Sequence, residues 1–300
     1  MRTKTYLFAL MAMALTLGSC SDNENGIGGE TSKYITVSTS IGNMTRVATD
    51  EKGGQTFEEG DEISVYAWTG DATVAPETRE RVVNNAINKL TNGSWVSTPQ
   101  MLWKNNRDKH YFIGVYPISA ISDLSAGEYT FDETKQVESD LLVAVNKDGL
   151  SYNVDEQQPV PLTFTHVMAK LVVNLTYKNQ WGGIPTVEKV VVGNAAKEAT
   201  INYLTKVVTP STTAKEDFSL PEITENTKYV SVIIPQEDVK QLTIVIGGKN
   251  FVYDNGTPFK LESGKITTVN LEVGRDEIKL GDVKITDWEN GSTFSGEALN

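Results

Sequence analysis

Apolar and polar residues alternate along much of this chain with a period of two. Between residues 34 and 41 the sequence YITVSTSI places Ile35, Val37 and Ile41 on one face and mostly hydroxyl-bearing side chains on the other. A longer run over residues 162–177, LTFTHVMAKLVVNLTY, contains neither Gly nor Pro. A period of two is typical of a half-buried β-strand. We therefore predict a strand over residues 34–41 and one long central strand over residues 162–177, which opens a second domain.

Shorter segments of the same kind recur in both halves of the chain, separated by turn residues such as Asn92-Gly93 and Gly247-Gly248. Residues 79–90 are ambiguous, because their apolar positions fit a helix while three Asn residues disfavour one, and we favour strand and loop. No long amphipathic helix is predicted. The predicted fold class is all-β, with two β-sandwich domains in series over residues 33–158 and 159–300. Further strands are predicted over residues 63–68, 95–97, 111–116, 128–131, 140–145, 187–192, 199–203, 229–235, 242–246, 251–254 and 266–273.

The N-terminus has the pattern of a lipoprotein signal. Arg2 and Lys4 precede an apolar run over residues 6–17 that is too short to span a membrane. Leu17-Gly18-Ser19-Cys20 then resembles the bacterial lipobox, and Cys20 is the only cysteine. We predict a signal peptide over residues 1–20 with Cys20 as the lipid and palmitate attachment site; an ordinary secretory signal with an incidental cysteine is the alternative. Several acyl chains together anchor a protein stably.

The segment after the lipobox, residues 21–32, is polar, acidic and Gly-rich, which predicts a flexible tether. Its acidic residues resemble the surface-export signal of Bacteroidota lipoproteins, so we expect the protein on the outer face of the cell outer membrane. Without the first 19 residues the chain has 25 basic and 39 acidic residues, a net charge of −14. Such a surface repels phosphate backbones, and we expect no nucleic-acid partner.

Motifs for catalysis and for metal binding are missing from the sequence. There are two histidines, His110 and His166, and neither has Cys, His or carboxylate neighbours at metal-ligand spacing. No EF-hand, nucleotide-binding or Gly-x-Ser-x-Gly motif is present. We predict a non-enzyme with no cofactor, no metal and no catalytic residue. An uncharacterised hydrolase stays an alternative, because a pair of glycosidase carboxylates is not recognisable among surface acids.

His166 and the tryptophans could serve either in packing or in binding. His166 lies in the long apolar run next to Thr165, and we expect it to be structural with a polar partner. The five tryptophans, which could stack on sugar rings, are expected to serve in packing. They are Trp68, Trp95, Trp103, Trp181 and Trp288.

Several motifs occur in an order that resembles the fimbrillin family of Bacteroidota, the type V pilins and their anchor-like relatives. The resemblance covers nearly all of the chain after the signal, and the Phe-x-His and final Ile-x-x-Trp motifs are its more specific parts. The motifs are Phe57-Glu58-Glu59-Gly60-Asp61-Glu62-Ile63, Val65-Tyr66-Ala67, Trp103, Tyr111-Phe112, Tyr116-Pro117, Asp140-Leu141-Leu142, Leu162-Thr163-Phe164-Thr165-His166-Val167-Met168-Ala169-Lys170, Ile233-Ile234-Pro235-Gln236, Gly264-Lys265 and Ile285-Thr286-Asp287-Trp288.

This resemblance implies two transthyretin-like β-sandwich domains, export as a lipoprotein, and assembly with other fimbrial subunits into a fimbria without catalysis. In stalk members of the family an arginine-specific protease cuts after the first strand, and the C-terminal strand of the next subunit fills the groove left behind, a form of donor-strand exchange. Arg46, followed by Val47, stands where that cut would fall. Arg79 and Arg81 lie in another polar stretch and leave the assignment open.

The residues at the two ends of the chain are compatible with such an exchange. Ile35, Val37 and Ile41 of the displaced strand each contribute roughly 1.5 to 3 kcal/mol when buried. The segment 277–288 offers a comparable series as the donor strand, with a one-residue change of phase at Gly281-Asp282 where a bulge is predicted. Its donor residues are Ile278, Leu280, Val283, Ile285 and Trp288.

We therefore predict a structural subunit of a cell-surface fimbria, assembled by protease-triggered donor-strand exchange. A surface glycan-binding outer-membrane lipoprotein that does not polymerise is the alternative, since it too would be lipidated, acidic, all-β and rich in tryptophan. The position in the fibre, whether stalk, tip or anchor, is left open by the sequence.

Overall fold

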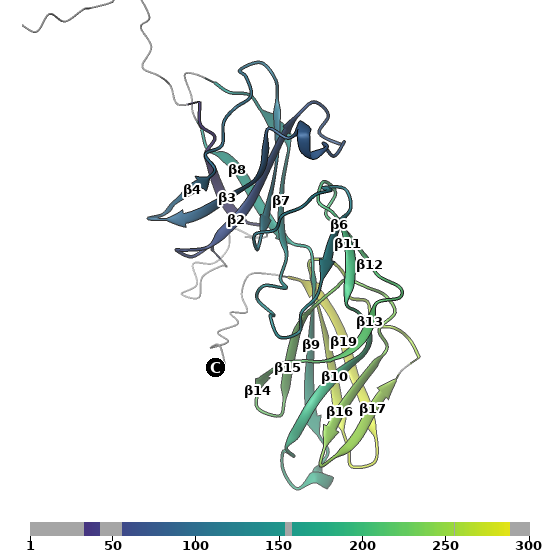
Figure 1. The fold of residues 1–300 in the computed structure, drawn as a ribbon. Helices are drawn as coiled ribbons and strands as arrows, with labels where there is room; N and C mark the ends of the chain where they lie inside the picture. Colours follow the sequence, from purple (N-terminus) through teal and green to yellow (C-terminus); the bar gives the residue numbers. More distant parts are fainter. Residues whose placement is uncertain (1–32, 43–55, 154–157, 255, 289–300) are drawn as a thin grey trace, which may run out of the picture. The chain divides into compact units, whose positions relative to one another are not determined.

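Strands form almost all of the regular structure in this protein (Figure 1). The structure is a computed structural model, and it describes residues 33–42, 56–153, 158–254 and 256–288. Its only helical elements within these ranges are two 3₁₀ turns, η1 (Thr78–Glu80) and η2 (Asn179–Trp181). No helix in the described part of the chain is long and apolar enough to cross a lipid bilayer. The predicted all-β class is confirmed.

The N-terminal half builds one seven-stranded sheet. Its strands are antiparallel to their neighbours except the first, β1, which runs parallel to β8. In order across the sheet they are β1 (Val37–Ile41), β8 (Val160–His166), β7 (Leu142–Leu150), β5 (His110–Tyr116), β2 (Glu62–Thr69), β3 (Val83–Thr91) and β4 (Ser94–Thr98).

The C-terminal half contains three further sheets, of five, four and three strands. The first has the order β14 (Glu222–Thr224), β15 (Lys228–Ile233), β9 (Ala169–Tyr177), β18 (Lys265–Val273) and β19 (Ile278–Asp287). The second has the order β13 (Lys215–Ser219), β10 (Val187–Ala196), β16 (Gln241–Ile246) and β17 (Lys249–Asp254). The third has the order β12 (Val207–Pro210), β11 (Glu198–Asn202) and β6 (Gly127–Thr130).

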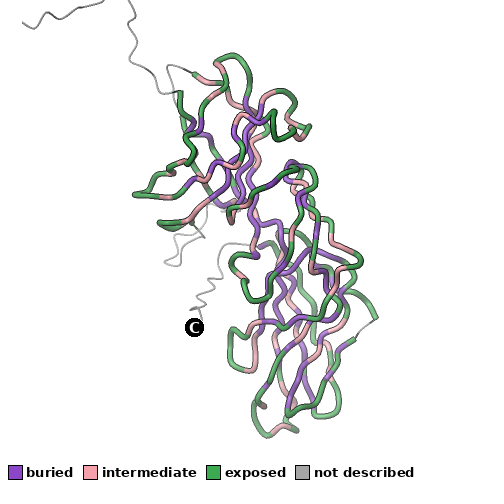
Figure 2. Tube along the Cα trace, in the orientation of Figure 1, coloured by how far each residue is buried: buried purple, intermediate pink, exposed green. Residues whose placement is uncertain are grey.

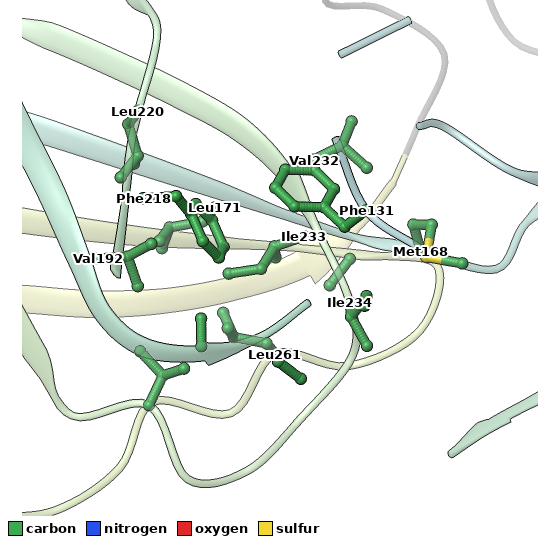
Figure 3. Packing of buried hydrophobic residues seen from close by; sticks show 14 of the residues in the cluster. Phe131, Met168, Leu171, Val192, Phe218, Leu220, Val232, Ile233, Ile234 and Leu261 are labelled. Carbon is green, nitrogen blue, oxygen red and sulfur yellow. The ribbon is translucent and has the colours of Figure 1, made fainter. Parts of the chain in front are cut away.

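Alternation along the strands separates two hydrophobic clusters. Buried and exposed stretches interchange along the chain (Figure 2). On β2, Val65 belongs to the smaller cluster while its neighbour Tyr66 belongs to the larger one, because successive side chains point to opposite faces. The larger cluster continues through the C-terminal sheets, where Leu171, Val192 and Phe218 pack together (Figure 3). The smaller cluster has fifteen buried residues, and Ile35, Val37 and Ile41 supply three of them.

The long apolar run at residues 162–177 is not one strand. It is divided between β8 and β9, which lie in different sheets, so the prediction of a single central strand was wrong. The break falls at Val167-Met168, where the Val167 amide donates to the carbonyl of Leu141. Both residues at the break are buried, so hydropathy gives no sign of it. Strand pairing also crosses residue 158. β8 follows this residue and joins the seven-stranded sheet, whereas β6 precedes it and pairs with β11.

The ambiguous segment at residues 79–90 forms η1 and then β3, as the strand-and-loop prediction required. Asn92 and Gly93 turn the chain from β3 into β4 with φ values of 51° and 72°, a left-handed conformation that Asn and Gly adopt most readily. Their amides donate to the carboxylate of Glu59 at 2.8 and 2.6 Å. The three strands β12, β13 and β14 had not been predicted, because their side chains are mostly exposed and show no clear alternation.

Gly114 on β5 tests how tightly the smaller cluster is packed. A Cβ at this position would lie 2.6 Å from Cζ of the buried Phe164 ring and 3.1 Å from Leu162. We expect Gly114→Ala to lower the free energy of unfolding by about 1 to 3 kcal/mol through overpacking. Urea denaturation measures this change. Phe164→Leu in the same chain shortens the obstructing side chain and should recover part of the loss; a double variant no more stable than Gly114→Ala would contradict the packing explanation.

Candidate functional site

The N-terminal segment, residues 33–42, is held by backbone hydrogen bonds on two different sides. Its first part pairs with residues 101–103: the Ile35 amide donates to the carbonyl of Met101 (2.9 Å), and the Trp103 amide donates to the carbonyl of Lys33 (3.1 Å). From residue 36 onwards it pairs in parallel with β8, ending where the Gly42 amide donates to the Phe164 carbonyl (2.7 Å). The segment therefore closes one end of the seven-stranded sheet.

Side chains of this segment fill the smaller hydrophobic cluster. Ile35, Val37 and Ile41 are buried, and the residues between them are exposed or half-buried, as predicted for a half-buried strand, although the strand itself begins at Val37 and not at residue 34. The hydroxyl of Thr39, which points to the same face, accepts a hydrogen bond from Nε1 of Trp95 (3.0 Å). Removal of the segment would uncover an apolar groove and a row of unpaired backbone groups.

The three arginines considered for proteolytic processing differ in accessibility. Arg46 and Val47 lie outside the described residues, between Gly42 and the start of the next described segment, and so does Cys20 near the N-terminus. Arg79 has an 80% exposed side chain. Arg81 is buried, its guanidinium donates to the carbonyls of Ile121 and Ser122 (both 2.6 Å), and burial lowers its pKa. A protease therefore has much poorer access to Arg81 than to Arg79.

The C-terminal segment forms β19, an edge strand paired antiparallel with β18. Leu280 lies opposite Leu271 and Asp282 lies opposite Asn270, so Gly281 has no partner, which confirms the predicted bulge. Because directly opposed residues share a face, the bulge keeps four apolar side chains of β19 on one face, opposite the buried positions of β18. These four side chains are Ile278, Leu280, Val283 and Ile285.

The apolar face of β19 is only partly covered. Val283 is 40% exposed and Ile285 is 39% exposed, although the β18 residues opposite them, Val269 and Thr267, are fully buried. Charged side chains occupy several other positions of the strand, and no other strand among the described residues pairs with its outer edge. In contrast to the residues of β19, Trp288, the last residue described, is buried and only 3% exposed.

Three side chains lie at this tryptophan, two in contact with the indole and one bonded to His166, and together with it they form what we call the Trp288 cluster: Trp288, His166, Lys170 and Asp140. The ring of His166 stacks on the indole with 4.1 Å between centroids and 6° between planes, and Nζ of Lys170 lies 4.5 Å from the indole centroid. The Trp288 amide donates to the Gly264 carbonyl (3.0 Å). The two specific sequence motifs, Phe-x-His and Ile-x-x-Trp, thus meet in space.

His166 has the polar partner that the sequence predicted. Its Nδ1 donates to Oδ1 of Asp140 at 2.8 Å, since a carboxylate only accepts. In the neutral ring this leaves Nε2 as an acceptor, and no donor in the described part of the chain reaches it. Within the same part of the chain, no group of three or more His, Cys, Asp and Glu side chains is arranged to hold a metal ion.

A small pocket of about 210 Å³ adjoins the Trp288 cluster. Gly42, the last described residue of the N-terminal segment, lines it together with the end of β19. The strand that is predicted to leave and the strand that is predicted to move to another subunit therefore end at one place. The lining residues are Gly42, Thr165, His166, Ser263, Gly264, Lys265, Asp287 and Trp288.

The tryptophans are engaged in packing. Trp68 and Trp288 are buried, and Nε1 of Trp68 donates to the Asp71 carbonyl (2.9 Å). Trp95, Trp103 and Trp181 are half-buried and contact other aromatic rings edge-on. A shallow depression of about 780 Å³ has Trp68 and Trp103 in its wall, but both rings pack against neighbouring aromatics. No observation here favours glycan binding.

The fold and the two terminal strands together define an all-β protein whose first and last strands both lie at sheet edges. A family model described as fimbrillin-like matches residues 45–288, and the chain belongs to that family. No curated protein matches the chain.

Solved structures of similar fold include proteins from three Bacteroides species. A proposed cell adhesion protein from Bacteroides uniformis is 20% identical, with a TM-score of 0.63 over 86% of this chain and 100% of the other. One from Bacteroides ovatus is 18% identical, with a TM-score of 0.62 over 85% of this chain and 98% of the other. A fimbrial protein from Bacteroides vulgatus is 12% identical, with a TM-score of 0.54 over 86% of this chain and 100% of the other. At these identities the likeness shows a shared fold.

Burial of Lys170 makes stability depend on pH. Desolvation lowers its pKa from 10.5 to about 8, while the charge of Asp140 opposes that shift and the charge of Lys228 adds to it. Between those values the unfolded chain binds the proton more tightly, so stability rises with pH and is lost again as pH falls towards 8. From pH 8 to 9.5 we expect a gain of about 1.5 kcal/mol in the free energy of unfolding.

Urea denaturation at the two pH values measures this gain, with Lys170→Met as the matched variant that lacks the titrating group. The parent chain should gain stability relative to Lys170→Met over this interval. Equal changes in the two proteins would show that Lys170 is not the source.

Proposed function

We propose that this chain is a structural subunit of a cell-surface fimbria that assembles by donor-strand exchange. Membership of the fimbrillin-like family supports a fimbrial role. The observation that carries the assembly mechanism is the position of residues 33–42. They fill a groove with three buried side chains, lie at a sheet edge, and connect to β2 through the segment that contains Arg46.

Proteolysis at Arg46 would turn this strand into a separate peptide. Once cut, residues 33–42 are held without a covalent link, chiefly by hydrogen bonds to β8 and to residues 101–103 and by the burial of Ile35, Val37 and Ile41. A strand with equivalent side chains can then replace it without loss of backbone pairing. Before the cut, the tethered strand keeps the groove filled and prevents premature polymerisation.

The pattern of β19 matches the groove. The groove takes side chains at positions 35, 37, 39 and 41, of which only position 39 is polar in the resident strand. β19 is ten residues long, and its bulge at Gly281 places four apolar side chains on one face with the same spacing. A donor that keeps this bulge would put Ile278, Leu280, Val283 and Ile285 at the four positions in turn. Without the bulge, a charged residue would enter the groove at the third position.

Lipidation at Cys20 would place the subunit on the outer membrane during export. The small residues before Cys20 give a lipoprotein signal peptidase access, and the acidic tether after it suits transfer to the cell surface. The partners of the mature protein are then other fimbrial subunits and an arginine-specific protease. Catalysis and cofactors have no part in this role.

Cys20→Ala tests the lipid attachment. In a Bacteroidota host, the variant should lose labelling by a palmitate analogue and should leave the membrane fraction, because no other thiol is present to accept a lipid. Ser19→Gly is a control that keeps the cysteine and a small residue before it, and it should still be labelled. Continued labelling of Cys20→Ala would refute the assignment.

Arg46→Ala and Ile285→Asp test the two halves of the exchange. After treatment with an arginine-specific protease, the parent should give a ladder of polymers on a gel. Arg46→Ala should stay a folded monomer, because the strand remains tethered. Ile285→Asp should be cut but should not polymerise, because a carboxylate cannot enter the apolar groove without a large desolvation penalty.

Two matched controls accompany these variants. Arg79→Ala removes an exposed arginine of the described chain and should polymerise like the parent. Thr286→Asp places the same charge on the opposite face of β19 and should also polymerise. If Arg46→Ala still forms ladders, cutting occurs elsewhere; if Ile285→Asp does, β19 is not the donor.

A further inference from the structure

β19 is held to its own sheet unevenly. Every residue from Ile278 to Asp287 is exposed or half-buried, and only Trp288, which follows the strand, is buried. Peripheral contacts of an edge strand with exposed side chains contribute little to stability, whereas full burial of a large aromatic side chain contributes several kcal/mol. Trp288 is therefore the one fully buried side chain at this end of β19, which is otherwise held by backbone pairing with β18 and by the Lys265–Asp287 ion pair.

Trp288 packs against a residue of β8, the strand with which β1 pairs. His166, whose ring stacks on the indole, is the last residue of β8. β1 pairs with that same strand in register, with Ile41 opposite Phe164 and the Gly42 amide bonded to the Phe164 carbonyl. Gly42 lines the pocket beside Trp288 and lies against Thr163 and Thr165, which a Cβ on Gly42 would approach to 3.0 and 3.4 Å.

We propose that the Trp288 cluster couples the two ends of the chain, so that β19 is released from its own sheet when residues 33–42 leave the groove. This inference rests on the proposed function and concerns its regulation. A subunit that still carries its first strand is then inactive in both senses: its groove is full and its donor strand is docked. Loss of the first strand makes it an acceptor and a donor together.

Solvent access supplies the physical link. With residues 33–42 in place, Gly42 covers the end of β8, and His166, Lys170 and Trp288 are all buried. Departure of the strand uncovers the β8 edge next to His166 and admits water to the pocket. Stacking and cation–π contacts weaken when water solvates the ring and the ammonium group. The Asp140–His166 hydrogen bond, which orients the ring, then competes with water as well.

Hydrogen–deuterium exchange on the uncleaved monomer tests the coupling without any polymerisation. Val37→Ala weakens the first strand at a buried position of the smaller cluster. We expect amides of β19 to exchange at least about fivefold faster in this variant, relative to amides of the central strand β16, because coupled sites shift together. Val83→Ala truncates an equally buried valine of β3 in the same cluster. It should change the exchange rates of β19 amides by no more than about twofold.

The reciprocal change completes the test. Trp288→Ala should speed exchange in β19 and also in β1, because coupling between two sites is reciprocal. Trp288→Phe retains an aromatic ring over His166, and its exchange rates should lie between those of Trp288→Ala and the parent. The inference is overturned if Val37→Ala affects β19 no more than Val83→Ala does, or if Trp288→Ala frees β19 and leaves β1 unchanged. The first of these comparisons decides the matter even if Trp288→Ala does not fold.

These outcomes are separate from those of the assembly experiment. Coupled exchange in a protein whose Ile285→Asp variant still polymerises would support the Trp288 cluster and reject β19 as the donor. Polymerisation as proposed with uncoupled exchange would support the donor strand and reject the coupling.

Discussion

The structure of the N-terminal half depends on a strand that occupies a sheet edge and completes a core at the same time. Residues 33–42 supply three buried side chains to a cluster of fifteen and satisfy backbone groups of both β8 and residues 101–103. Loss of the strand would expose the apolar wall of the groove to water, and burial of each apolar side chain contributes roughly 1.5 to 3 kcal/mol, so the groove is less stable empty than filled. In the proposed exchange, an equivalent strand would restore this burial.

The C-terminal strand, β19, differs from residues 33–42 because its apolar side chains are only partly covered. β19 is paired with β18, yet its apolar face is incompletely covered, and no strand in the described part of the chain pairs with its outer edge. Such an edge invites pairing with other chains, and charged residues on an edge strand discourage it. Lys279 and Lys284 of β19 are both exposed. An apolar face together with charged residues is compatible with the proposed transfer of β19 from its own sheet to a groove.

Both constraints meet at the Trp288 cluster. A single buried indole connects the end of β19 to His166, and His166 belongs to the strand on which β1 lies. Under the proposed mechanism, two independent openings would leave partly active intermediates. A shared contact would avoid this, because the energy that holds one strand in place would then depend on the presence of the other.

Much of this arrangement is local, and the sequence by itself determined it. The alternation at Ile35, Val37 and Ile41 specified a half-buried strand, the change of phase at Gly281 specified a bulge, and Asn92-Gly93 specified a tight turn, because each depends on a few adjacent residues. The tertiary structure alone decided that residues 162–177 divide between two sheets, that Asp140 is the partner of His166, and that Trp288 stacks on that histidine. The physical reason is that hydropathy encodes which face of a strand is buried, whereas the element that buries it is chosen by packing between segments far apart in the chain.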